Sequence, residues 1–136
     1  MARVEQLFEH RFPSGLDWRV AQFGLHVSVV AEHLGLELQV WEEDGLGDVT
    51  GLFLRLPSGR LLLLREFHHS LHGLYPPSFE ACADGHDVAM HGAPEIVEDM
   101  LPVCGLSRAE ITWIGDEESR QTAIGLLDRW RCRLSE

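Results

Sequence analysis

The sequence contains no lysine, so its permanent positive charge rests on arginine alone. Eleven basic residues stand against 22 aspartates and glutamates, which gives a formal net charge of −11 with the histidines neutral. A field of this sign repels phosphate, and it argues against binding to nucleic acid or to an anionic membrane. The exclusive use of arginine is typical of GC-rich coding and indicates a bacterial source. The acidity itself fits either a basic partner or an ordinary solvated surface.

Long apolar runs, cysteine pairs and leader-like segments are missing as well. No stretch approaches the ~20 apolar residues of a membrane-spanning helix, and the first residues lack the apolar core of a signal peptide. Cys82, Cys104 and Cys132 are widely spaced, and we expect buried thiols rather than a zinc ribbon or disulfides. With 136 residues, 45% of them hydrophobic, the chain predicts a single domain, residues 1–136, in the cytoplasm.

Motifs that identify a chemical reaction are absent from the sequence. No serine lies in a GxSxG elbow. The segment Gly45-Leu46-Gly47 lacks the third glycine and the lysine of a phosphate-binding loop. Asp44 and Asp48 do not follow a calcium-loop pattern. We therefore expect a protein without catalytic activity and without a cofactor.

A β-hairpin gives the clearest structural signal. Apolar residues alternate with others over 51–56, and Pro57-Ser58-Gly59 predicts a turn. Arg60–Phe67 then returns as an almost continuous apolar run, which is typical of a strand covered on both faces. We expect this second strand to be interior, with Leu62 and Leu64 buried.

Helices are predicted at both ends of the chain. Val4, Leu7 and Phe8 share one face of a short first helix, and a longer helix runs from Asp17 to about Leu34. Alternation around residues 23–29 also fits a strand, so that alternative stays open. The remaining expected elements are a strand at 36–41, a strand at 79–83, a helix at 94–103, a strand at 111–114 and a final helix capped by Ser119. The predicted fold is α+β: a mostly antiparallel sheet with a central β-hairpin, helices packed on it, and helical N- and C-termini.

Histidine is concentrated in one segment, with five of the eight between residues 68 and 91. Residues His68 and His72 are four apart and would share a helix face, where they can hold a metal ion. However, no ligand signature is present, and Gly73 and Pro76 disfavour a helix there. An exposed histidine-rich loop is the favoured interpretation. The alternative is a metal-binding protein or metal-dependent enzyme that uses His68, His72, His86 and His91.

Acidic residues fall into two regions. Between Arg65 and Arg108 no residue carries a permanent positive charge, and a second acidic stretch follows Trp41, which we expect to be partly exposed. Two such regions suit a protein that plugs a basic groove, because complementary charge speeds association and fixes the register of binding. The candidate partner-binding residues are Trp41, Glu42, Glu43, Asp44, Asp48, Asp84 and Asp87.

The chain resembles the small, acidic immunity proteins that accompany bacterial polymorphic or contact-delivered toxins. The likeness rests on size, acidity, the acidic loop after Trp41, the hairpin Gly51–Phe67, and the segment Leu101–Leu106 leading to Ile111-Thr112-Trp113. It implies a non-catalytic protein that neutralises a cognate toxin by occluding a basic active site. The chain is also similar in size and charge to acidic type III secretion chaperones, although their strand pattern is not evident in residues 68–92.

Overall fold

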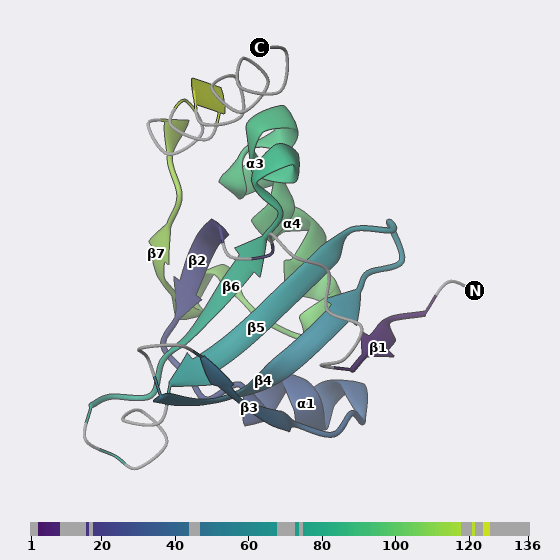
Figure 1. Cartoon of the computed structure of the whole chain (residues 1–136), viewed down its shortest axis with the longest axis vertical. Helices are drawn as coiled ribbons and strands as arrows, with labels where there is room; N and C mark the ends of the chain where they lie inside the picture. The colour runs from purple at the N-terminus through teal and green to yellow at the C-terminus, as the bar shows by residue number, and fades with distance from the viewer. Residues whose placement is uncertain are drawn as a thin grey trace.

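The computed structural model describes residues 3–8, 16, 18–43, 47–67, 73, 75–117, 121, 124 and 125. Within them, seven strands form one sheet in which every pairing is antiparallel. The strands are β1 (Glu5–Leu7), β2 (Trp18–Phe23), β3 (Gln39–Glu43), β4 (Gly47–Arg55), β5 (Leu61–Phe67), β6 (Phe79–Ala83) and β7 (Ile111–Ile114). Their order is β1-β4-β5-β6-β2-β7 (Figure 1). Strands β1 and β3 both pair with the same edge of β4, each along a different half of it.

Three helices, α1 (Ser28–Leu34), α3 (Gly85–His91) and α4 (Ala93–Cys104), pack on one face of this sheet. Val30, Val88 and Ile96 from these helices join sheet residues such as Leu54 and Leu64 in the larger of two apolar clusters. The expected α+β class, with a mostly antiparallel sheet and helices packed on it, is confirmed.

The predicted central hairpin is present as β4 and β5. Leu52 pairs with Leu64 and Leu54 with Leu62, so four leucines meet on the face that the helices cover. Gly59, with φ of 90°, closes the turn in a conformation that residues with a Cβ rarely adopt. Strand β5 lies between β4 and β6, and Leu62 and Leu64 are fully buried, as the sequence predicts.

The opposite face of the sheet carries the second apolar cluster. Trp41, Phe53, Leu63 and Cys82 are members, together with Leu7, Leu16 and Val49. Trp41 is only 8% exposed, so the expectation that it is partly exposed was wrong. Its ring lies over Gly51, where a Cβ would come within 2.9 Å of the indole and would collide with the carbonyl oxygen of Leu64. The tryptophan is therefore part of the core.

Two predicted helices near the start of the chain are strands in part or in whole. Glu5–Leu7 is β1, which pairs with residues 53–55, so the predicted helical N-terminus was wrong. Within the predicted helix of residues 17–34, Trp18–Phe23 is β2 and only Ser28–Leu34 is helical. Pairing of β2 with β6 and β7 buries Val20, Ala21 and Phe23 completely, and this long-range packing overrides the local helical period.

The later helices and strands agree more closely with the elements predicted from the sequence. Strands β6 and β7 coincide with the predicted 79–83 and 111–114, and α4 ends at Cys104 before Gly105. The predicted strand at 36–41 is shifted to Gln39–Glu43, and α3 was not predicted. The predicted C-terminal helix falls almost entirely outside the described residues.

Replacement of Leu62 or Leu64 by alanine is expected to lower the free energy of unfolding by about 2–5 kcal/mol, because each substitution leaves a cavity in an enclosed site. Chemical denaturation followed by circular dichroism measures the change. Leu61→Ala, at a half-buried position of the same strand, serves as the control and should cost less. Unchanged denaturation midpoints for both core variants would contradict the assignment of β5 to the core.

Candidate functional site

The end of the β3–β4 hairpin places two carboxylates against each other. The register pairs Glu42 directly with Asp48, and both residues are exposed. Like charges at directly opposed positions of an antiparallel pair destabilise the sheet. Among the residues that the structure describes, neither carboxylate takes part in an ion pair. We call Glu42 and Asp48 the acidic hairpin end.

The other candidates in this region are placed only in part. Glu43 is the last residue of β3, opposite Gly47. Asp44 lies outside the described residues. Because Trp41 is buried, it is not available as an aromatic anchor beside these acids.

The second acidic region lies at the opposite end of the hairpin strands. Asp84 and Asp87 border a hollow of about 510 Å³ beside α3, together with Ser58 and Arg60 of the β4–β5 turn. Strand β4 runs from the acidic hairpin end to this turn (Figure 1). At about 3.3 Å per residue the strand separates Asp48 from Arg55 by roughly 23 Å. The fold therefore does not bring the two acidic regions together.

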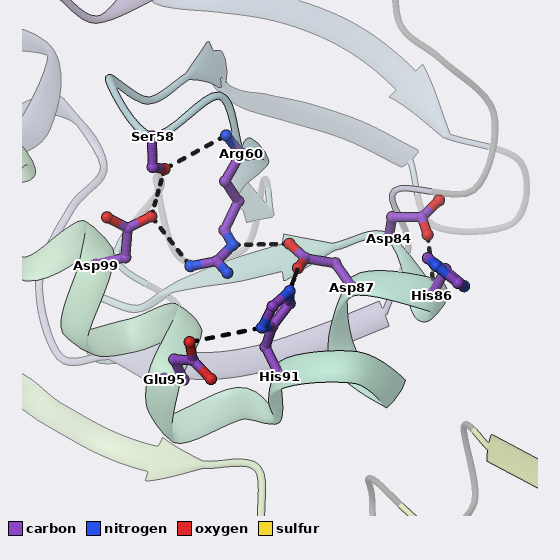
Figure 2. A network of polar contacts seen from close by, with 8 residues as sticks. All are labelled: Ser58, Arg60, Asp84, His86, Asp87, His91, Glu95 and Asp99. Atoms are coloured by element: carbon purple, nitrogen blue, oxygen red, sulfur yellow. Dashed lines mark hydrogen bonds and ion pairs between the residues drawn. The ribbon is translucent and has the colours of Figure 1, made fainter.

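Arg60 is the centre of the polar contacts at this hollow (Figure 2). Its Nε donates to Asp87 Oδ2 at 2.8 Å, and its Nη1 donates to Asp99 Oδ2 at 3.0 Å. The Ser58 hydroxyl donates to the same Asp99 oxygen at 2.6 Å. Only 12% of the arginine side chain is exposed. These contacts tie the β4–β5 turn to α3 and α4, and Asp87 and Asp99 share the positive charge of Arg60.

Asp84 has a local structural role. It precedes α3 in extended conformation, and its Oδ1 accepts the backbone N–H of His86 at 2.8 Å (Figure 2). This is the geometry of an N-cap, which satisfies a donor that the first turn of a helix leaves unpaired. Asp84 and Asp87 therefore both hold α3 in place, and neither requires an external partner to explain its position.

The histidines of the segment are only partly placed. His86 and His91 are exposed and border the same hollow. The His91 ring lies between two carboxylates, with Nε2 3.8 Å from Asp87 Oδ1 and Nδ1 3.5 Å from Glu95 Oε1. His68 and His72 lie outside the described residues, and among those described no group of three or more histidine, cysteine or acidic side chains is arranged to hold a metal ion. The metal alternative stays a prediction.

A buried carboxylate that the sequence analysis missed fixes the start of α1. Glu66 is fully buried, with Oε1 accepting the backbone N–H of Val27 at 2.9 Å and Oε2 2.6 Å from His26 Nδ1. The signal was present in the sequence: Glu66 follows Leu62 and Leu64 at two-residue spacing, so strand alternation points it to the same enclosed face.

Cys104 faces the core from the last turn of α4. Burial raises the pKa of its thiol from the ordinary 9.0 to about 12, and the negative charge of Asp99 adds to the shift. Because the thiolate is the nucleophilic form of cysteine, the raised pKa disfavours nucleophilic reactions of Cys104 at neutral pH.

No protein-family model matches the chain, and comparisons with curated proteins and with solved structures find no match. Among the described residues, no helix is both long enough and apolar enough to cross a membrane.

Replacement of Arg60 by methionine is expected to lower the free energy of unfolding by about 2–4 kcal/mol, because Asp87 and Asp99 lose their shared counter-charge in a partly desolvated site. Urea denaturation of purified variants gives the values. Arg55→Met is the matched control, since Arg55 and Glu5 are both half exposed and 3.9 Å apart; it should cost about 0.5 kcal/mol or less. Equal losses in the two variants would mean that the Arg60 contacts contribute no more than a surface pair.

The stability of the protein is expected to fall between about pH 9 and pH 12. The unfolded Cys104 thiol loses its proton near 9.0, whereas the folded thiol keeps it to about 12. Unfolding therefore releases a proton in this interval, and stability that is complete below pH 9 is lost as the pH rises. Denaturation at a series of alkaline pH values measures the slope, and Cys104→Ala should make it shallower. An identical slope in both proteins would contradict the raised pKa.

Proposed function

We propose that this protein binds a positively charged protein partner through the acidic hairpin end, as an immunity protein that occludes the basic active site of a toxin in the bacterial cytoplasm. The observation that carries the proposal is the direct opposition of Glu42 and Asp48, both exposed. Their mutual repulsion costs stability in the isolated protein. A lysine or arginine from a partner would relieve that repulsion and gain two charge-assisted contacts.

The surroundings of these carboxylates support a protein partner. Val40 lies two residues before Glu42 and therefore on the same face of β3, and it is 64% exposed. In the described part of the chain, β4 is the only strand that pairs with β3. An exposed apolar side chain and a carboxylate on β3, with a second carboxylate opposite on β4, suit a partner surface with both apolar and basic groups.

The net charge of the protein also favours a basic partner. With a formal charge of −11, the protein attracts a basic surface over long range and repels phosphate. A toxin that acts on nucleic acid needs a positive cleft, so carboxylates on this hairpin can take the place of the substrate's phosphates. Asp84 and Asp87 are weaker candidates because they already hold α3.

The first experiment identifies the partner. The protein is purified from its native host, co-purifying proteins are identified, and the leading one is expressed with and without this chain. An immunity protein is expected to restore growth and to abolish the partner's activity in vitro. A partner that is exported rather than inhibited would favour the secretion-chaperone alternative. A metabolic gene neighbourhood without a protein partner would refute the immunity proposal.

The second experiment tests the charge mechanism. Glu42→Gln with Asp48→Asn is expected to lower the association rate constant for the partner by roughly tenfold at low salt and to flatten its salt dependence, because steering charge is removed at the contact. Surface plasmon resonance at several salt concentrations gives both quantities. Glu32→Gln with Glu37→Gln removes the same charge from two other exposed acids and should have little effect. Equal rates for the two double variants would exclude the acidic hairpin end as the contact.

A further inference from the structure

A second hollow lies on the sheet face that the helices leave uncovered. It has a volume of about 390 Å³, within the range of small-molecule sites. Its floor is a row of polar side chains across three neighbouring strands. The register places Arg65 of β5 opposite Glu80 of β6, and Glu80 opposite Gln22 of β2. Strand alternation directs these side chains away from the helices, because their neighbours Leu64 and Ala81 belong to the helix-covered core.

Aromatic side chains line the hollow beside this row. Phe67 lies two residues after Arg65 on the same strand face, and the guanidinium carbon is 5.5 Å from the centre of its ring. Tyr75 also lines the hollow and is 64% exposed. The site thus combines a few polar groups with apolar walls, which is the usual composition of a small-molecule site.

The two charged groups are close but not tightly bonded to each other. Arg65 Nη2 lies 3.5 Å from Glu80 Oε2, beyond the usual N–H···O distance of about 3 Å. Both side chains are largely buried, at 13% and 14% exposed. Glu80 Oε2 also lies 3.8 Å from the Cys82 thiol. A guanidinium has five N–H donors and a carboxylate accepts several hydrogen bonds, so these contacts do not by themselves use the full capacity of either group.

Among the described residues that line the hollow, Arg65 and Glu80 are the charged ones, and their opposite charges make this lining close to neutral within a protein of net charge −11. The protein's field disfavours an anionic ligand. A cationic ligand would have to approach the Arg65 guanidinium. A net-neutral ligand whose own opposite charges are adjacent can contact both Arg65 and Glu80. It avoids both the repulsion of an anion by the protein's field and the repulsion of a cation by Arg65.

We propose that this hollow binds a free α-amino acid with an aromatic or large apolar side chain. The ligand carboxylate accepts from Arg65, its ammonium donates to Glu80, and its side chain packs against Phe67 and Tyr75. Arg65 Nη2 and Glu80 Oε2 are 3.5 Å apart, so one α-carbon carrying both charged groups can bridge the pair. The proposal is independent of the acidic hairpin end and does not require a protein partner.

Isothermal titration calorimetry with L-phenylalanine tests the ligand class. We expect saturable 1:1 binding with a dissociation constant of about 1 mM or tighter. Phenylalanine amide lacks the carboxylate and 3-phenylpropionate lacks the ammonium, so each should bind roughly tenfold or more weakly, since each loses a charge-assisted contact. Absence of binding by phenylalanine, or equal binding of all three compounds, would overturn the proposal.

Variants locate the binding. Arg65→Gln and Glu80→Gln should each weaken phenylalanine binding by roughly tenfold or more, whereas Arg55→Gln, in an exposed cross-strand pair, should leave it unchanged. Tyr75→Ala removes an exposed wall residue outside the core and should weaken binding severalfold even where a charge variant fails to fold. Binding that is unaffected by Tyr75→Ala and by every folded charge variant would place the ligand elsewhere and refute the assignment.

Discussion

The alternation of side chains along β5 determines which residues face the helices and which face the opposite side of the sheet. The strand is paired on both sides, so its side chains have only two directions open to them. Leu62 and Leu64 point toward the helices. Glu66 follows on the same face, and its carboxylate accepts a backbone N–H at the start of α1. Leu63 belongs to the apolar cluster on the opposite face, and Arg65 forms part of the polar row there. A shift of one residue in register would place the charged Arg65 in the helix-covered core and move the Glu66 carboxylate away from α1. The hairpin register is therefore the constraint from which the other contacts follow.

Several of the described arginines have partners within the chain. Arg60 joins the β4–β5 turn to two helices, and Arg65 pairs with Glu80 across two strands. Arg19 lies over the ring of Trp113, and Arg108 forms an ion pair with Glu98. Among the described residues, the acidic hairpin end is one place where carboxylates stand without a nearby cation.

The elements that could be predicted from the sequence are those with local signals. Pro57-Ser58-Gly59 identifies the hairpin, and Gly105 identifies the end of α4. Strand β2 could not be recognised, because its partners lie about 60 and 90 residues further along the chain and impose a strand on a segment with a helical period. The acids after Trp41 were visible in the sequence, but only the register shows that Glu42 faces Asp48. The structural roles of Asp84 and Asp87 depend on Arg60 and on a helix that composition alone did not reveal.

The position of β2 has a consequence for how the protein is made. This strand is the second of the described strands in chain order, yet it is hydrogen-bonded between β6 and β7, which are synthesised much later. The hairpin of β4 and β5 can form while the ribosome is still translating, since its strands are neighbours in sequence. Residues 18–23 must wait for Phe79–Ala83 and then for Ile111–Ile114 before both edges of β2 are paired. During translation the nascent chain therefore exposes an apolar segment with unpaired backbone, of the kind to which chaperones bind.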